Sequence, residues 1–359
     1  MTAPLRVALI GYGLAGRVFH RPLIGVTPDL VITSVVTSAA ERRAAAEDDI
    51  PGVRVLDGVD QLWARAGEHD VAVVATPNAL HATVARAALE AGLHVVVEKP
   101  FAAHAADARR LVDVATRHGR VLTVFQNRRW DGDFLTVDQV IAAGSIGEVA
   151  RFESRFERWQ PSADLSAWRQ RAEPDAAGGL LYDLGSHLVD QAIQLFGRPS
   201  SVYAEMSSRR PGVSVDDDTF IALQHAGGVS SHLSASAVAA LPAARFRVLG
   251  SSGAYAKHGL DIQEEQLRAG VPANAAEFGV EPPTRWGRLH TQGQERLHPT
   301  ERGRWVDFYA MLTDAIRNGA PPPVDPNDAV VVIEVLEAAL TSARTGSVTE
   351  SASGVQGED

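Results

Sequence analysis

The sequence predicts an α/β protein with two parts: a doubly wound parallel sheet at the N-terminus, then an α+β part with an open, mostly antiparallel sheet. Three observations lead to this. Apolar runs alternate with alanine-rich segments in the first third of the chain, as strands alternate with helices in doubly wound folds. A glycine-rich turn directly follows the first run. Further on, apolar and polar residues alternate, which is typical of strands with one solvated face.

The first part is expected over residues 1–124. Its strand-like runs are Val7–Ile10, Val31–Val36, Val71–Val74, His94–Val97 and Val121–Phe125. These runs lack polar alternation, so they suit strands that are covered on both faces. Between them, Leu80–Ala91 and Ala105–Arg117 have helical spacing and good helix propensity.

The second part is expected over residues 125–345. Val149–Trp159 alternates and predicts a half-solvated antiparallel strand. Two hairpins follow, one within Thr219–Ala237 and one formed by Ala244–Gly250 and Ala254–His258. Residues 269–303 are rich in glycine, proline and polar residues and predict a long excursion. Helices are expected at Trp305–Asn318 and Ala329–Arg344, and a flexible tail at 346–359.

Composition excludes several classes of protein. The chain has 359 residues, enough for about two domains, and a net charge of -10, which disfavours general binding to nucleic acid or anionic membranes. It contains no cysteine, which excludes disulfides, a thiolate nucleophile and cysteine metal sites. No signal peptide is recognisable and no apolar stretch approaches the ~20 residues that cross a bilayer, so a cytoplasmic location is expected.

The glycine-rich turn has the pattern G-x-G-x-x-G and predicts dinucleotide binding. Its residues are Gly11, Tyr12, Gly13, Leu14, Ala15 and Gly16. The first glycine allows a tight turn, the second lets the backbone approach a pyrophosphate, and the third lets the helix pack on the strand. Because the motif lies between a strand and a plausible helix, it favours a Rossmann domain, although a purely structural turn remains the alternative.

The end of the second strand distinguishes NADP from NAD. An NAD site usually has an acidic residue there for the ribose hydroxyls. This chain has Ser38 instead, followed by Arg42 and Arg43. A hydroxyl and a guanidinium suit a ribose 2′-phosphate, so NADP is favoured. The alternative is that both arginines lie on a solvated helix face.

Three further motifs predict hydride-transfer chemistry. Thr76, Pro77, Asn78 and His81 follow the third strand, and Glu98 and Lys99 follow the fourth, where a Rossmann sheet presents its loops to the cofactor. Asp183 and His187 are four residues apart, so on a helix they share a face, and the carboxylate can orient the imidazole as an acid/base. No pattern suggests a metal. Each motif alone also fits an ordinary surface or packing role.

Together these motifs resemble the glucose–fructose oxidoreductase/inositol dehydrogenase (Gfo/Idh/MocA) family. The resemblance covers the chain to about residue 345 and rests on the glycine turn, Thr-Pro-Asn-x-x-His, Glu98-Lys99-Pro100, and Gly178-Gly179 leading to Asp183 and His187. Further segments resemble its NADP-dependent scyllo-inositol dehydrogenase branch. They are Val18-Phe19-His20, Asn127–Asp131, Tyr182–His187 and Ala256–Asp261. His258 departs from that pattern, since close relatives more often have tyrosine there.

The resemblance implies catalytic positions for Lys99, Asp183 and His187, a place near the nicotinamide for Asn127, and a substrate-side place for Arg128. Trp168 and Arg169 are further candidates for holding substrate hydroxyls, with ordinary packing as their alternative. We expect an NADP-dependent oxidoreductase acting on a secondary alcohol of a cyclic polyol or sugar, assembled as a homodimer or homotetramer. A non-catalytic NADP-binding sensor and a redox-assisted glycoside-cleaving enzyme remain alternatives.

Overall fold

The computed structural model describes residues 3–165, 170 and 176–350. Contacts group the chain into two compact units that are not continuous in sequence. The first unit comprises the chain up to Gly132, Asp261–Val280 and Arg302–Val330, and the second comprises Asp133–Leu260, Glu281–Glu301 and the chain from Val331 onward. Two segments from beyond residue 260 therefore join the N-terminal unit, whereas the sequence suggested a division at residue 124.

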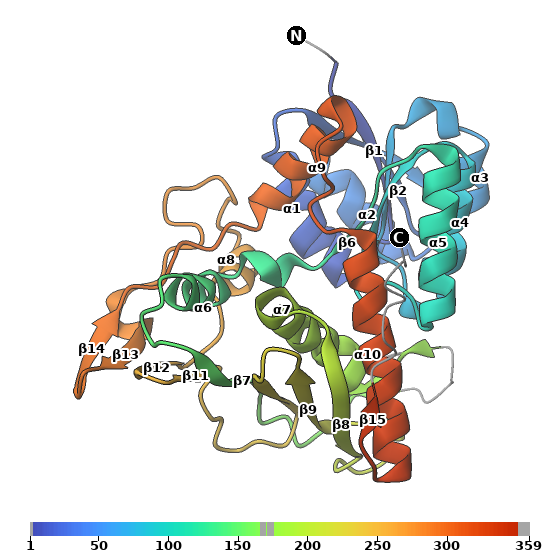
Figure 1. Cartoon of the computed structure of the whole chain (residues 1–359). Helices are drawn as coiled ribbons and strands as arrows, with labels where there is room; N and C mark the ends of the chain where they lie inside the picture. The colour runs from blue at the N-terminus through green and yellow to red at the C-terminus, as the bar shows by residue number, and fades with distance from the viewer. Residues whose placement is uncertain (1–2, 166–169, 171–175, 351–359) are drawn as a thin grey trace, which may run out of the picture. The chain divides into compact units, whose positions relative to one another are not determined.

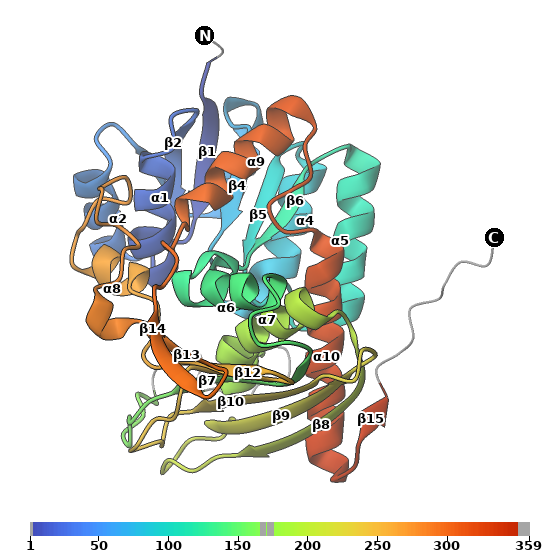
Figure 2. The same cartoon turned by 60° about the vertical axis from the view of Figure 1, so that its left-hand side comes forward.

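The first unit is built on a parallel sheet, as predicted. Among the described residues its strand order is β3-β2-β1-β4-β5-β6, and all neighbouring strands run parallel. The strands are β1 (Leu5–Ile10), β2 (Leu30–Val36), β3 (Arg54–Leu56), β4 (Val71–Val74), β5 (His94–Glu98) and β6 (Leu122–Phe125). Only β3 was not expected. The central strands β1, β4 and β5 are buried because helices cover both faces of the sheet (Figures 1 and 2).

Helices connect these strands, and one short helix follows the last of them. They are η1 (Ala15–His20), α1 (Arg21–Gly25), α2 (Ala40–Asp49), α3 (Val59–Trp63), η2 (Ala66–Glu68), η3 (Asn78–Leu80), α4 (His81–Glu90), α5 (Ala105–His118) and η4 (Asn127–Trp130). Of these, η1 is a π-helical turn, wider than an α-helical one. Helix α5 ends because Gly119 adopts a left-handed conformation (φ 59°), which glycine tolerates best.

The late segments of the chain complete the first unit with α8 (Gln263–Arg268) and α9 (Val306–Asn318). The Thr123 hydroxyl on β6 donates a hydrogen bond to the Val324 carbonyl and accepts one from the Val324 N–H. The ring of Phe125 packs edge-on against Phe308, with centroids 4.9 Å apart. These contacts explain why residues more than 170 positions beyond β6 belong to this unit.

The second unit contains a nine-stranded sheet in the described residues, with the order β14-β13-β12-β11-β7-β10-β9-β8-β15. The strands are β7 (Val149–Glu157), β8 (Pro199–Ser207), β9 (Asp218–His225), β10 (Ser230–Ser236), β11 (Phe246–Gly250), β12 (Gly253–Lys257), β13 (Gly287–Thr291), β14 (Gln294–His298) and β15 (Thr349–Glu350). The hairpins β9–β10 and β11–β12 confirm the prediction. The sheet is mostly antiparallel.

Three details of this sheet differ from the sequence-based expectation. Strand β7 is antiparallel to β11 but parallel to β10, because the chain returns beside β7 only after forming β8 and β9. The excursion at 269–303 contains the hairpin β13–β14. Thr349 and Glu350, expected in a flexible tail, pair with β8.

Helices cover one face of the second sheet. They are α6 (Gly132–Ala142), η7 (Leu181–Gly185), α7 (Ser186–Phe196) and α10 (Pro326–Thr345), with the short η8 (Pro283–Arg285) outside this layer. Phe152, Phe156 and Phe246 fill the space beneath α6 and α7 and are almost fully buried. No helix of the described residues lies on the opposite face of this sheet (Figure 2). The helices at Trp305–Asn318 and Ala329–Arg344 are confirmed as α9 and α10.

None of the described helices combines the length and apolar character that a membrane span requires. Within the same residues, no group of three or more histidine and carboxylate side chains is arranged to hold a metal ion.

Candidate functional site

The glycine turn after β1 has the geometry that its pattern predicts. Gly11 has φ 103°, and a Cβ atom there would lie 2.3 Å from the Ala75 carbonyl oxygen. A Cβ atom on Gly16 would lie 2.1 Å from the Gly11 carbonyl oxygen. Both positions therefore require glycine for packing. At Gly13, a Cβ atom would meet only the Arg42 Nη1 atom, at 4.0 Å, so this part of the turn has room for a ligand.

The side chain of Tyr12 lies away from that open part of the turn. Its hydroxyl donates a hydrogen bond to the Asp49 carboxylate at 3.0 Å, and Arg17 Nε donates to the same carboxylate at 2.7 Å. These contacts fix the turn to the end of α2. If Tyr12 binds the dinucleotide as predicted, the contact is therefore made by its backbone and not by its side chain. Leu14, two residues further on, is exposed at the start of η1.

The end of β2 separates the two arginines of the NADP prediction. Ser38 is exposed just beyond the strand. Arg43 is ion-paired with Asp57. Arg42 makes no hydrogen bond or ion pair with a described residue, and its guanidinium lies beside Gly13. Of the two, Arg42 is therefore the one available to a phosphate.

The end of β4 carries Thr76 and His81. The Thr76 hydroxyl oxygen is buried and finds no hydrogen-bond partner among the described residues. The His81 ring is buried between two carbonyl oxygens, with Nδ1 2.8 Å from that of Pro100 and Nε2 2.9 Å from that of Thr76. Burial lowers the pKa of His81 despite these two acceptors. Pro77 precedes η3, and Asn78 is buried at its start.

The end of β5 carries Glu98 and Lys99, followed by a cis peptide bond to Pro100. Lys99 is partly exposed, whereas Glu98 is buried. The Lys99 backbone N–H donates to the Glu98 carboxylate at 3.1 Å. Burial works to raise the pKa of Glu98, but the nearby His20 and Lys99 outweigh it and hold this pKa below its ordinary value.

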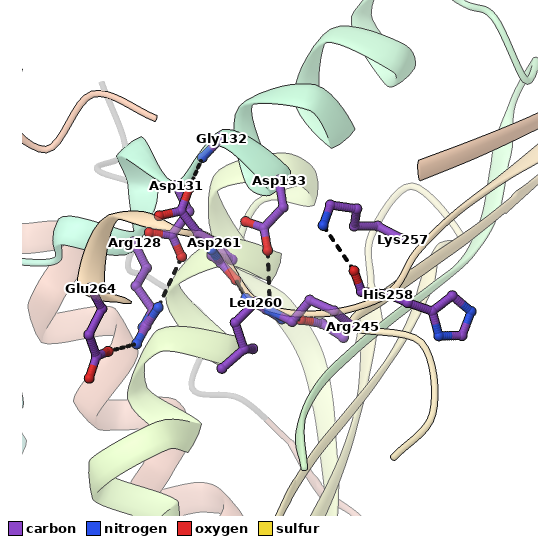
Figure 3. Close-up of polar contacts among 12 residues, drawn as sticks. Arg128, Asp131, Gly132, Asp133, Arg245, Lys257, His258, Leu260, Asp261 and Glu264 are labelled. Atoms are coloured by element: carbon purple, nitrogen blue, oxygen red, sulfur yellow. Dashed lines mark hydrogen bonds and ion pairs between the residues drawn. The ribbon is translucent and has the colours of Figure 1, made fainter. Parts of the chain in front are cut away.

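Asn127 and Arg128 begin η4, directly after β6. Asn127 is buried. Arg128 is held by two carboxylates: Nη1 lies 3.2 Å from Asp131 and Nη2 lies 3.1 Å from Glu264 on α8 (Figure 3). Desolvation works to raise the pKa of Glu264, but Arg128 and Arg268 outweigh it and lower this pKa. Two carboxylates therefore hold the Arg128 guanidinium in place. Its role on the substrate side stays a prediction.

Asp183 and His187 lie in the second unit. Asp183 is on the π-helical turn η7, and His187 is in the first turn of α7, which continues it. Four residues are close to one turn in either geometry, so the two side chains project from the same side of the helix. Asp183 is partly exposed and His187 is 4% exposed, with its ring 6.3 Å from that of Phe156.

Asp216 anchors the start of this helix. Its backbone carbonyl accepts the Leu180 N–H at 3.0 Å, and its carboxylate accepts the Leu181 N–H at 2.7 Å. Gly179 has φ 86°, and a Cβ atom there would come within 1.9 Å of the Asp216 carboxylate. Desolvation raises the pKa of Asp216. No sequence motif predicted this residue, although the acidic run Asp216–Asp218 at the start of β9 was a visible signal.

The structure thus gathers the predicted dinucleotide residues and Lys99 in the first unit, and places Asp183 and His187 together in the second. Trp168 and Arg169 lie outside the described residues. The fit of a dinucleotide to the first unit depends on three observations: the open turn at Gly13, the Arg42 guanidinium beside it, and the unsatisfied Thr76 hydroxyl. These residues fit a phosphate-bearing cofactor.

Comparison with known proteins identifies the family of both parts of the chain. Residues 5–126 match the model of the oxidoreductase family with an NAD-binding Rossmann fold, and residues 134–256 match that of the GFO/IDH/MocA C-terminal domain. The uncharacterized oxidoreductase YdgJ of Escherichia coli K12 is 40% identical over 348 residues, which cover 96% of this chain and 98% of that protein.

Two further relatives extend the comparison. The scyllo-inositol 2-dehydrogenase (NADP(+)) IolW of Bacillus subtilis is 32% identical over 344 residues, covering 95% of this chain and 94% of that protein. The crystal structure of an oxidoreductase from Bacillus cereus superposes with a TM-score of 0.86 at 30% identity, covering 96% of this chain and 98% of that one. The dinucleotide turn, the Lys99 turn and both domain matches lead to one conclusion: the chain belongs to the Gfo/Idh/MocA family of oxidoreductases.

Proposed function

We propose that this protein is an NADP-dependent dehydrogenase that oxidises a secondary alcohol of a cyclic polyol or sugar, or reduces the corresponding ketone. The observation that carries the proposal is the glycine turn with the Arg42 guanidinium beside Gly13 and no acid at Ser38, in a chain that also holds the Asp183–His187 pair. The relative IolW, named as an NADP-dependent scyllo-inositol dehydrogenase, supports the same substrate class.

The first unit would hold the cofactor. The backbone of residues 11–16 and the start of η1 suit the pyrophosphate, since unpaired N–H groups at a helix N-terminus bind anions. Ser38 and Arg42 suit the 2′-phosphate of the adenosine ribose. Thr76, Asn78 and Asn127, at the ends of β4 and β6, suit the nicotinamide end, because Rossmann sheets bind dinucleotides outside the carboxyl ends of their strands.

The nicotinamide, when bound, supplies the hydride acceptor. His187 would take the hydroxyl proton of the substrate as the carbonyl forms, which is the role of a positioned general base. Asp183 would orient the imidazole and stabilise its protonated form. Lys99 would donate a hydrogen bond to the reacting oxygen, where negative charge develops. In ketone reduction the same groups act in reverse.

The proposal is tested with a panel of inositols, other cyclic polyols and sugars, assayed by the absorbance of reduced cofactor with NADP and NAD in parallel. We expect net NADPH formation with at least one cyclic polyol or sugar. Cofactor binding without turnover on any member would favour a sensor. Glycoside cleavage without net NADPH would favour the redox-assisted hydrolytic reaction. Either result would overturn the proposal.

A further inference from the structure

His20 is a buried histidine to which the proposed reaction gives no role. It is the last residue of η1, the helical turn that follows the glycine turn, and its side chain is fully buried. Its Nδ1 atom lies 2.6 Å from the Tyr309 hydroxyl on α9. Its Nε2 atom lies 3.0 Å from a carboxylate oxygen of Glu98 at the end of β5. The ring also packs on Phe125, with centroids 4.4 Å apart.

The neighbours of His20 determine which of its ring nitrogens carries the proton. Burial, together with the charge of Glu98, raises the pKa of Tyr309 well above its ordinary value, so its hydroxyl keeps its proton. A protonated hydroxyl can donate or accept, so the Glu98 carboxylate, which only accepts, decides the direction. In the neutral ring the proton therefore resides on Nε2, which lies 3.0 Å from Glu98, and Nδ1 accepts from the Tyr309 hydroxyl.

Glu98 connects His20 to the backbone of Lys99. The second carboxylate oxygen of Glu98 accepts the Lys99 backbone N–H at 3.1 Å. On the other side of Lys99, the His81 ring lies 2.8 Å from the Pro100 carbonyl oxygen. The backbone is thus held both before and after the lysine. Three elements far apart in the sequence, η1, β5 and α9, meet behind this turn.

An apolar set of side chains would fill the same space at a lower desolvation cost. Burying a histidine, a carboxylate and a phenol is costly unless each has a polar neighbour, and such neighbours favour one arrangement of the three side chains. In this protein the polar network holds the backbone before and after Lys99 in one conformation.

We propose that His20 and Tyr309 are positioning residues for Lys99, acting through Glu98. This inference rests on the proposed function only in taking Lys99 to contact the reacting oxygen. Because His20 also ends η1, which contains Gly16, the network ties the dinucleotide turn to the Lys99 turn within one unit.

The first test uses variants of the network in the full-length protein. Tyr309→Phe removes one hydroxyl and should lower kcat about 10-fold, comparable to the smaller losses seen when the hydrogen-bonding partner of a metal ligand is removed, while leaving KM for NADP unchanged. His20→Leu should lose more. His20→Gln should restore part of the activity, because its amide can donate to Glu98 and its oxygen can accept from Tyr309.

A matched control comes from the same helix. The buried Thr313 hydroxyl donates to the Tyr309 carbonyl at 2.9 Å but does not contact His20. Thr313→Val should therefore leave kcat unchanged. In a Lys99→Ala background, Tyr309→Phe should cause no further loss, because the two residues act on the same step. Equal losses in both backgrounds would overturn the inference.

A second readout does not require activity. Lys99 and Lys257 are the only two lysines of the sequence. Lys257 belongs to the second unit, where it is buried 3.2 Å from Glu281, so it serves as an internal reference. With ¹³C-labelled lysine, the NMR signal of the Lys99 side chain should shift in Tyr309→Phe, and that of Lys257 should not. Two unmoved signals, or two moved ones, would overturn the inference. An inactive wild-type protein whose Lys99 signal responds would overturn only the proposed function.

Discussion

Arg42 gives the sharpest test of cofactor choice. Its Nη1 atom lies 4.0 Å from the Cβ position of Gly13, and it makes no ion pair with a described residue, whereas Arg43 is ion-paired with Asp57. We expect Arg42→Ala to weaken the use of NADP and to leave the use of NAD nearly unchanged. Arg43→Ala is the matched control on the same helix and should alter the preference far less.

The magnitude follows from the contact. A hydrogen bond between charged partners contributes about 1.5–3 kcal/mol, which corresponds to roughly 10- to 150-fold in kcat/KM. Arg42 is exposed, so solvent screening places the expected loss at the low end, about 10-fold. Ser38→Asp should act more strongly, because it sets a carboxylate against the 2′-phosphate and offers an acceptor to the ribose hydroxyls of NAD.

The assay is the ratio of kcat/KM for NADP and NAD, measured on the wild type and on each variant with one substrate. A wild type that uses NAD equally well or better would refute the reasoning. So would an Arg42→Ala variant that loses both cofactors to the same extent, since Arg42 would then support the turn and not the phosphate.

Three further predictions concern catalysis, pH and assembly. His187→Ala should lower turnover about 10²–10⁴-fold while NADPH binding, measured by fluorescence titration, stays nearly intact; a near wild-type rate would remove His187 from the mechanism. Burial works to raise the pKa of Asp217, but the backbone N–H groups of Arg209 and Arg210 and the Arg210 guanidinium lower it overall. This stabilisation is therefore present above the unfolded-state pKa of about 3.9 and is lost as the pH falls through the lower folded-state pKa. Asp217→Asn should lower the free energy of unfolding at pH 7 and reduce its fall between pH 7 and 3, and an unchanged fall in denaturant titrations would contradict this. We also propose that the uncovered face of the second sheet forms a homodimer or homotetramer; a light-scattering mass near 38.3 kDa at micromolar concentration would exclude it.

The elements predicted well are those that local pattern determines. The runs Val71–Val74 and His94–Val97 lack polar alternation, which suits strands of a parallel sheet covered on both faces. The glycine turn was equally predictable, because its pattern lies within one βα unit and Gly16 packs on the Gly11 carbonyl oxygen there, although Gly11 itself packs against the distant Ala75. The hairpins β9–β10 and β11–β12 also depend on short-range turns.

The remaining features depend on contacts between residues far apart in the sequence. Pairing of β7 with β10 is set by where the chain returns, which no local alternation reports. His20 is 289 residues from Tyr309, and each alone reads as an ordinary core residue. Asp216 acts on Leu181 across 35 residues, and only the folded chain brings that carboxylate to the helix start.

The π-helical turns η1 and η7 make the geometry of the site depend on the number of residues in each turn. A π turn contains more residues than an α turn, so each behaves as a helix that has accommodated an insertion. Removing Leu184 would let η7 close into an α-helix and leave α7 downstream unchanged. Asp183 would then stand three residues before His187, a spacing that keeps both side chains on one face of the helix but changes the angle between them. Substitutions near the pair alter its surroundings, whereas a single deletion or insertion alters its geometry, and the same holds for Gly16 and His20 across η1.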